Sequence, residues 1–219
     1  NFFNLIFLIL FMLKEWISGE YLKQSRINQL KNSFQKNKPF PHLILKDFFN
    51  TKKIIPVQAA LENEEFVFKN TDLFQFRQTK TDMESSENKE IKEFHSFFKS
   101  KEFGKYIYDL TDIKITYGKI DMSGFVYSKT DYLLPHDDRL EGRKLAYVVN
   151  LSKNFRKSDG GKLQMFDTRN KKPFKIVKSY IPAFNTLTLF EVSEISFHQV
   201  EEVLSYKDRI SFAGWFHED

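Results

Sequence analysis

The sequence predicts a mainly β domain with flanking helices, an α+β fold whose strands form a sandwich or jelly roll. Short apolar segments recur at regular intervals from roughly residue 113 onward, and turn residues separate them, a pattern typical of packed antiparallel sheets. Earlier in the chain, several segments carry apolar residues at helical spacing. No internal repeat of roughly 20 to 50 residues is visible.

Composition places the chain among globular domains with a mildly basic surface. Its 219 residues are enough for one large domain, or for one domain with an extension. Hydrophobic residues make up 41% of the chain, and its 25 phenylalanines predict an aromatic-rich core. The net charge of +5 and the pI of about 9.1 are compatible with a patch that faces a ribosome or nucleic acid, and also with lysines that only confer solubility. Cysteine is absent, which excludes disulfides and suits a reducing compartment.

The chain begins with an apolar run, 2–13, interrupted only by Asn4. The run is too short for the ~20 residues that span a bilayer, so we expect an amphipathic or core-docking helix. A secretory signal and an artefact of gene prediction are the alternatives, although no basic segment precedes the run and no cleavage site is clear after it. Residues 15–37 have the spacing of a surface helix. We therefore expect an N-terminal apolar and helical extension over 1–38 and the main domain over 39–219.

The first half of the main domain is predicted to alternate between extended segments and helices. Extended segments are expected at 40–45, 66–68 and 73–76, and helices at 54–63 and 91–103. The charged, serine-rich segment 79–90 contains no aromatic residue and is expected to form a mobile loop near the entrance of a substrate site. His95 lies on the second helix, where we expect packing or exposure rather than metal binding.

The second half of the chain is predicted to supply most of the sheet. The expected strands are 113–115, 122–127, 145–151, 161–166, 174–180, 186–190, 197–204 and 210–216. Gly160 and Gly161 precede one of these strands, and glycine tolerates the positive φ and the close approach that a tight turn needs.

Two histidines and one aspartate have the chemistry of a metal centre. His136 and Asp138 are two residues apart, so on an extended strand their side chains point to the same side. His198 follows 60 residues after Asp138 (198 − 138), a gap that fits several strands returning to one rim of a barrel. Two imidazoles and one carboxylate leave positions open on the metal, which is the ligand set of non-heme Fe(II) oxygenases. The pattern therefore predicts an iron site.

A fixed cation follows the last of these ligands. Arg209 comes 11 residues after His198 (209 − 198), which suits a turn and the next antiparallel strand. A guanidinium beside the metal can bind a dicarboxylate cosubstrate through two parallel hydrogen bonds, which a lysine ammonium cannot match. Ser211 lies two residues further on the same strand face and can add a hydroxyl hydrogen bond, or it faces only the edge of the core.

The residues around these side chains resemble a known family, the 2-oxoglutarate- and iron-dependent prolyl hydroxylases that modify a small-subunit ribosomal protein. The segment LLPHDDRLEGRK at 133–144 looks like the family's first metal motif, and the segment at 190–205, which begins FEVS, looks like the second. GWFH at 214–217 is similar to the strand after the arginine, and FPH at 40–42 also fits. The resemblance covers roughly residues 39–219, and the length of the second motif favours this subfamily over other prolyl hydroxylases.

The resemblance implies a double-stranded β-helix that uses Fe(II), 2-oxoglutarate and dioxygen, with ascorbate as a further cofactor. By this resemblance His136, Asp138 and His198 are the catalytic metal ligands, and Arg209 binds the far carboxylate of 2-oxoglutarate. Tyr127 matches a tyrosine that the family has near the cosubstrate, and the alternative for it is a packed aromatic residue.

One position departs from the family pattern. Asn150 stands where a tyrosine commonly contacts the 2-oxoglutarate carboxylate. Its side chain is shorter, but its amide can still donate a hydrogen bond. Tyr147 lies three residues earlier and is expected to point to the opposite side of the strand, so it is a poor substitute. We therefore expect a change in cosubstrate affinity rather than in chemistry.

The activity that the resemblance implies is hydroxylation, at C3, of one proline in a loop of the decoding-centre protein of the small ribosomal subunit, with effects on translation accuracy and termination. Translation-termination or messenger-ribonucleoprotein factors are implied as further partners. Direct DNA binding and membrane association are not expected. The implied location is the cytoplasm and nucleus, with secretion left open by the N-terminal run. The family's second, C-terminal domain is expected to be absent from these 219 residues.

Three other functions are compatible with parts of the sequence. A nucleic-acid or lysine demethylase would share the iron chemistry, but Trp215 stands where the alkylation-repair oxygenases have a second arginine. A secretory prolyl 4-hydroxylase of the collagen type would explain the N-terminal run, while the absence of cysteine counts against it. A non-catalytic scaffold that binds a ribonucleoprotein or a termination factor would be favoured by loss of a metal ligand, and none is lost.

Overall fold

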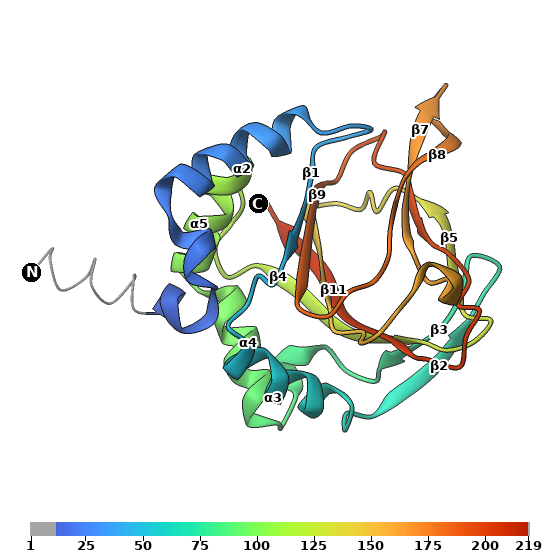
Figure 1. Cartoon of the computed structure of the whole chain (residues 1–219), viewed down its shortest axis with the longest axis horizontal. Helices are drawn as coiled ribbons and strands as arrows, with labels where there is room; N and C mark the ends of the chain where they lie inside the picture. The colour runs from blue at the N-terminus through green and yellow to red at the C-terminus, as the bar shows by residue number, and fades with distance from the viewer. Residues whose placement is uncertain (1–11, 219) are drawn as a thin grey trace, which may run out of the picture.

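The computed structural model describes residues 12–218 and shows a strongly curved, antiparallel sheet with helices gathered against one side (Figure 1). The described residues form eleven strands in the order β1-β9-β6-β11-β4-β3-β5-β10-β7-β8, with β2 paired to β3. This arrangement confirms the predicted fold class. The strands are β1 (His42–Lys46), β2 (Phe66–Asn70), β3 (Phe74–Thr79), β4 (Ile120–Tyr127), β5 (Tyr132–His136), β6 (Arg143–Asn150), β7 (Leu163–Arg169), β8 (Lys172–Tyr180), β9 (Thr186–Glu191), β10 (His198–Val200) and β11 (Arg209–His217).

The main core lies between the helices and the β1-β9-β6-β11-β4 part of the sheet. It is rich in aromatic side chains, as the composition predicts, and α4 provides one apolar face at helical spacing. The buried residues of that face are Ile91, Phe94, Phe97 and Phe98. The helices are α2 (Gln24–Lys36), α3 (Thr51–Leu61), α4 (Lys89–Lys99) and α5 (Lys101–Thr111), with short 3-10 helices at Gly19–Leu22, Met83–Ser85 and Lys157–Asp159.

Ser100 divides into two the single helix predicted over 91–103. Its backbone is extended, with φ −65° and ψ 144°, and its hydroxyl accepts a hydrogen bond from the Phe103 backbone N–H (3.1 Å). The same hydroxyl donates to the Phe97 carbonyl (2.7 Å). One side chain therefore ends α4 and caps the start of α5, a role typical of serine at a helix N-terminus.

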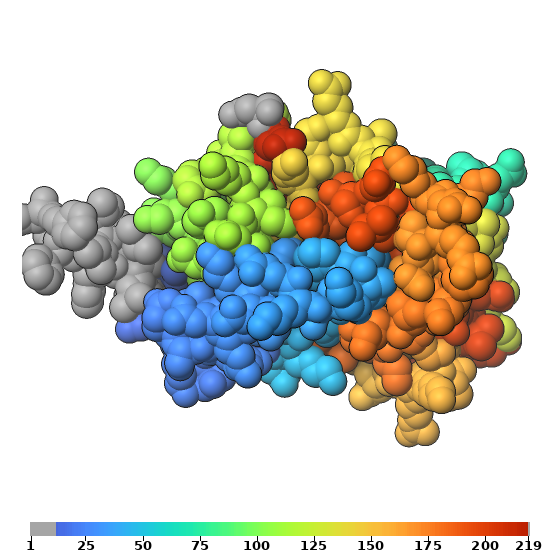
Figure 2. Space-filling view, turned by 90° about the horizontal axis from the view of Figure 1, so that it is seen from above, coloured from blue at the N-terminus to red at the C-terminus, as the bar shows by residue number. Residues whose placement is uncertain are grey.

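The described part of the N-terminal segment, from residue 12 onward, packs against the main core. Trp16 stacks on Phe97 with ring centroids 5.3 Å apart, and Ile17 forms a β-bridge with Phe49. The helix expected on the surface at 15–37 begins later, as α2, and buries one face. Figure 2 shows this segment (blue) lying beside the helical region (green), where α2 contacts α5. The buried residues of α2 are Ile27, Leu30 and Phe34.

The predicted apolar run at 2–13 lies almost entirely outside the described residues. Within residues 12–218, no helix has the length and apolarity needed to cross a bilayer.

Two predicted elements differ from the structure. Residues 113–115 are irregular and not a strand. The segment 79–90 packs against the sheet, with Met83 fully buried and an Asp82 oxygen accepting the Met122 N–H at 3.0 Å. A carboxylate at a turn can bond a neighbouring backbone in this way, and charge and serine content alone do not reveal it.

Candidate metal and cosubstrate site

His136 and His198 are direct partners on neighbouring strands. His136 ends β5, His198 begins β10, and the two Cα atoms are paired in the β5–β10 ladder. Side chains opposite each other in an antiparallel pair lie on the same face, and here the imidazole centroids are 4.2 Å apart. Four strands, β6 to β9, intervene in the sequence between the two histidines, so the predicted return to one rim of the sheet is confirmed.

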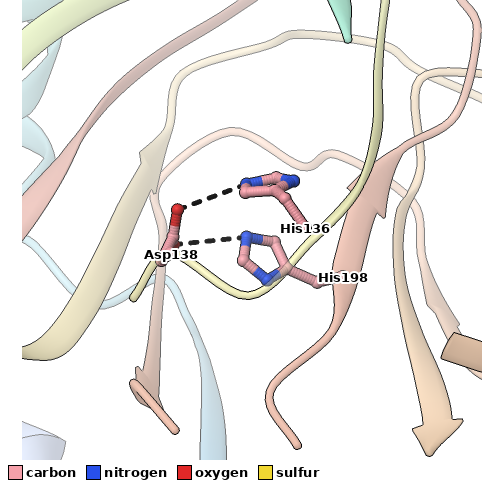
Figure 3. A group of neighbouring side chains, drawn as sticks. All are labelled: His136, Asp138 and His198. Atoms are coloured by element: carbon pink, nitrogen blue, oxygen red, sulfur yellow. Dashed lines mark ion pairs between the residues drawn. The ribbon is translucent and has the colours of Figure 1, made fainter. Parts of the chain in front are cut away.

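Asp138 completes the group, but by a route that the sequence spacing does not predict. β5 ends at His136, and Asp138 adopts a left-handed conformation with φ 62°, which aspartate tolerates better than most residues. The expectation that both side chains project from one extended strand is therefore wrong, since a turn brings the carboxylate back. Its two oxygens lie 3.2 Å from His136 Nε2 and 3.4 Å from His198 Nε2 (Figure 3).

The backbone fixes which nitrogen of each imidazole faces the centre. His136 Nδ1 lies 2.9 Å from the Leu134 carbonyl, and His198 Nδ1 lies 2.9 Å from the Ser196 carbonyl. A carbonyl can only accept, so each Nδ1 carries the proton and each Nε2 presents its lone pair to the centre. Metal-binding histidines are commonly held in this way.

The three side chains fit an iron ion. Their ligand atoms all lie within 4.8 Å of one another, and they form the single such group among residues 12–218. Two neutral imidazoles with one carboxylate are the donor set that non-heme Fe(II) oxygenases use. The predicted metal ligands are thus brought together, whereas His95 and the two remaining histidines lie elsewhere.

Burial and mutual charge set the protonation of the three ligands. Burial raises the pKa of Asp138, but the two imidazoles outweigh it and hold that pKa well below its usual range. Burial lowers the pKa of His198 to about 4, and the charge of His136 adds to this effect. For His136, burial lowers the pKa, but the hydrogen bond and the charge of Asp138 outweigh it and the net pKa is raised. When the group takes up an additional proton in place of a metal, His136 therefore holds it in preference to His198.

The metal group lines one side of a cavity of about 370 Å³, and Arg209 lies in the same cavity. The Arg209 side chain is only 3% exposed. Its Nε donates to the Gly161 carbonyl (3.1 Å), and its Nη1 makes a long contact of 3.4 Å with the Ser211 hydroxyl. No carboxylate among the described residues lies within ion-pair distance of it. A buried guanidinium without a counter-ion favours an anionic ligand, as predicted for the distal carboxylate of 2-oxoglutarate.

Tyr127 and Ser211 also line this cavity. Tyr127 is the cross-strand partner of Arg209, whose guanidinium carbon lies 5.0 Å from the centre of its ring. Burial raises the pKa of the Tyr127 hydroxyl, so it stays protonated and can donate to an anion. Both side chains therefore stand where a cosubstrate carboxylate would meet Arg209, and their roles in binding it remain predictions.

Asn150 is the one predicted site residue that the structure does not bring into the main cavity. Its Oδ1 accepts the Ser152 N–H (3.0 Å), and the side chain lines a smaller space on the far side of Arg209. The arginine side chain separates the two spaces, so direct contact between Asn150 and the cosubstrate is not supported. Tyr147 points away, as expected, and its hydroxyl donates to the Asp121 carbonyl at 2.6 Å in the aromatic core.

Two residues that the sequence does not identify as functional, Arg143 and Trp215, form another wall of the cavity. The guanidinium carbon of Arg143 lies 3.3 Å from the centre of the Trp215 ring, a cation–π contact. The indole N–H of Trp215 is buried and acts on the Asp138 carboxylate, whose pKa it helps to lower. Both residues lie inside the motifs quoted above, so their positions offered a signal, but only the fold shows that they stack beside Asp138.

The β2–β3 hairpin forms the opposite wall of the cavity, through Lys69, Leu73 and Phe74. None of the residues 79–90 lines it. The expected position of a substrate entrance near 79–90 is therefore wrong, because that segment is held under β4 while the preceding hairpin reaches the cavity.

Known proteins share this arrangement. A model of the 2OG-Fe(II) oxygenase superfamily matches residues 122–217. The chain is 36% identical over 220 residues to a Xenopus laevis protein named prolyl 3-hydroxylase OGFOD1, an alignment that covers 93% of this chain and 42% of that protein. It is 31% identical over 204 residues to an Ostreococcus tauri protein named prolyl 3,4-dihydroxylase OGFOD1, with 85% and 39% covered. The names of both relatives confirm the resemblance to prolyl hydroxylases that the two metal motifs carry.

The curated relatives are longer than this chain, and the solved structure with a similar fold is more distant in sequence. The chain spans about two fifths of the length of these two curated relatives. A crystal structure of a Pseudomonas putida prolyl-4-hydroxylase superposes with a TM-score of 0.68 at 13% identity, covering 88% of this chain and 99% of that chain. At this identity the likeness shows the fold, and it confirms the predicted jelly roll.

Proposed function

We propose that the chain, which belongs to the 2OG-Fe(II) oxygenase superfamily, is a 2-oxoglutarate-dependent dioxygenase that hydroxylates a prolyl residue of a protein substrate. The observation that carries the proposal is the pairing of a His136–Asp138–His198 group with a buried, uncompensated Arg209 in one cavity. In the proposed reaction, one atom of dioxygen enters a C–H bond of the proline. The other enters succinate as 2-oxoglutarate loses CO2.

The residues of the chain divide the work between binding and orientation. His136, Asp138 and His198 would hold Fe(II), which with 2-oxoglutarate and dioxygen supplies the oxidising power for attack on an unactivated C–H bond. Arg209 anchors the distal carboxylate of 2-oxoglutarate, and the hydroxyls of Tyr127 and Ser211 stand ready to donate to it. The buried walls exclude water from the reacting atoms.

The cavity wall beside Asp138 supports a prolyl substrate over a cationic one. Trp215 offers an aromatic surface on which an uncharged pyrrolidine ring can pack, while Arg143 stacks on the indole and makes a long contact of 3.5 Å with the Asp138 carbonyl. An N-methylated lysine carries the same charge as this guanidinium and would be repelled. Trp215 in this wall also stands where the alkylation-repair oxygenases have a second arginine, which argues against the demethylase alternative.

The finer proposal concerns the protein substrate. We infer a proline in the loop of the small-subunit ribosomal protein at the decoding centre, hydroxylated at C3. Two observations support this. Relatives that cover most of this chain carry the name prolyl 3-hydroxylase, and the net charge of +5 suits a surface that approaches a ribosomal particle.

A direct test uses a peptide from that loop with Fe(II), 2-oxoglutarate and dioxygen. We expect succinate release coupled to a mass gain of one oxygen on proline, and fragmentation with NMR would identify the carbon. His136→Ala should abolish both signals. Binding of iron and 2-oxoglutarate without oxidation of this peptide would reject the ribosomal substrate and keep the oxygenase. Failure to bind iron would favour the scaffold alternative.

A further inference from the structure

Three neighbouring strands carry a row of polar side chains behind the cosubstrate cavity. Ser211 on β11 pairs with Asn150 on β6, and Asn150 pairs with Thr186 on β9. Directly opposed residues in antiparallel strands share a face of the sheet. A hydroxyl, an amide and a second hydroxyl therefore follow one another across the sheet, on the face that also carries Arg209.

The far part of this row borders a small space beside Arg209. The space has a volume of about 20 Å³, which is enough for one water molecule but not for a larger ligand. Val148, Leu163 and Arg209 line both this space and the main cavity, so the arginine stands at the boundary between the two. Its polar lining consists of Asn150, Tyr180, Thr186, Thr188 and Arg209.

Thr186 contributes a hydroxyl group that the protein itself does not satisfy. The residue is 6% exposed, and its Oγ1 has no hydrogen-bond partner. Such buried groups are rare in folded proteins, where an ordered water commonly satisfies them. Asn150 uses its Oδ1 to accept the Ser152 N–H, and no described residue accepts from its amide N–H groups. Two polar groups therefore face one water-sized space.

Thr186 and Arg209 are too far apart in the sheet for a direct contact through the row. Adjacent strands lie about 4.8 Å apart, so the two steps from β11 to β9 span roughly 10 Å. Both side chains line the intervening space, and one water there, which can join polar atoms up to about 5.5 Å apart, would link their ends. The Arg209 guanidinium otherwise has one hydrogen bond, from Nε to the Gly161 carbonyl, and a long contact of 3.4 Å with Ser211. A third hydrogen-bond partner would fix the plane of the Arg209 guanidinium group.

We propose that the space behind Arg209 binds one ordered water that connects the Thr186 hydroxyl, with help from the Asn150 amide, to the guanidinium. Thr186 is then a positioning residue, since it acts on 2-oxoglutarate only through Arg209. This inference rests on the cosubstrate role of Arg209 and not on the identity of the protein substrate. The readout is therefore ligand binding, without turnover or peptide.

The test compares 2-oxoglutarate binding to the Mn(II)-loaded protein and to three variants by calorimetry. Thr186→Val keeps the shape of the side chain and removes the hydroxyl, so the Kd for 2-oxoglutarate should rise roughly threefold to tenfold. Thr186→Ser keeps the hydroxyl and should restore most of the affinity. Thr111→Val, which removes another buried threonine hydroxyl far from the site (its Oγ1 donates to the Ile107 carbonyl at 2.8 Å), should leave the Kd unchanged.

Oxalate provides the second arm of the experiment, because it chelates the metal but is too short to reach Arg209. Its affinity and that of Mn(II) should be the same in the parent protein and in Thr186→Val. An unchanged 2-oxoglutarate Kd in Thr186→Val, or an equal loss for oxalate, would overturn the proposal. Absence of 2-oxoglutarate binding in the parent protein would instead overturn the role of Arg209, so the two failures are distinguishable.

Discussion

His136 and His198 face each other across the β5–β10 ladder, and each holds its Nδ1 proton against a backbone carbonyl two residues earlier in its own chain segment. The two imidazoles are thus oriented by the same local device. Because the strand pairing and the tautomer are both set by the backbone, the site is organised before any metal arrives. This preorganisation underlies the first two predictions.

Replacement of Asp138 by asparagine should remove metal binding while leaving the fold intact. The carboxylate lies 3.2 and 3.4 Å from the two imidazoles, and an amide in its place offers no anionic ligand. We expect the Kd for Fe(II) or Mn(II) to rise by more than about 100-fold, above the loss typical of outer-shell partners. Asp137→Asn is a matched control, because Asp137 bonds Arg139 at 2.9 Å and points away. Equal losses in both variants would contradict the ligand assignment.

Metal affinity should fall as the pH is lowered through the pKa of His136. That pKa is raised above its ordinary value of 6.5 by Asp138, against the effect of burial, while burial lowers the pKa of His198 to about 4 and Asp138 is ionised. Near neutral pH the main proton to be displaced is therefore the one on His136, and metal binding should release up to one proton. Calorimetry in buffers of different ionisation enthalpy measures this release. A metal affinity independent of pH between about 5.5 and 8 would refute it.

Arg209→Lys should weaken 2-oxoglutarate binding although it preserves the charge. Lysine lacks the planar fork that pairs with a carboxylate through two hydrogen bonds, so we expect a Kd increase of roughly 10-fold to 100-fold. Tyr127→Phe removes only one donor and should cost less. Binding is measured anaerobically with metal present, and metal affinity serves as the control. A Lys variant that binds as tightly as the parent protein would show that Arg209 does not hold the carboxylate.

Trp215→Leu should affect the protein substrate more than the cosubstrate. The indole forms a cavity wall with Arg143 stacked on it at 3.3 Å, but it does not border Arg209. We expect the KM for the peptide to rise about 10-fold, in line with loss of an aromatic contact at a binding site, while the Kd for 2-oxoglutarate changes less than about twofold. A matching loss of 2-oxoglutarate affinity would indicate a general disturbance of the cavity.

Ser100→Ala should lower the free energy of unfolding by about 1 kcal/mol, the usual effect of losing an N-terminal helix cap. The hydroxyl bonds α5 at Phe103 and α4 at Phe97, and alanine can make neither contact. Urea denaturation measures the change. Ser33→Ala is the control, because Ser33 lies inside α2 on an exposed face and bonds only the Gln29 carbonyl. A loss in Ser33→Ala as large as in Ser100→Ala would argue against the capping role.

Sequence patterns predicted the metal site well because its chemistry is carried by residue type. His136, Asp138, His198 and Arg209 converge as expected, and Tyr127 and Ser211 join them in one cavity. The strand positions that carry them follow from apolar alternation, which is a local property. The mainly antiparallel sheet follows from the same alternation.

Features that depend on contacts between residues far apart in the sequence, or on the conformation of one residue, were not predicted from the sequence. The left-handed turn at Asp138 and the break at Ser100 are single-residue events that leave the surrounding apolar pattern unchanged. Asn150 was expected at the cosubstrate because it aligns with a tyrosine of the resembled family, but it lines a smaller space next to Arg209 and not the main cavity. The sequence does not identify the residues that the N-terminal segment contacts, because partners such as Phe97 lie far away in the sequence.

The sheet order also constrains when the site can form during synthesis. β1 pairs with β9, through partners such as His42 and Phe190, and the metal-bearing β10 and the arginine-bearing β11 follow later still. A nascent chain that has not reached β9 has an unpaired β1, and one that has not reached His198 has only two of the three ligands. Closing loops of this length is slow compared with forming local helices. Loading of iron is thus coupled to completion of the jelly roll, and partial translation products would lack the assembled centre.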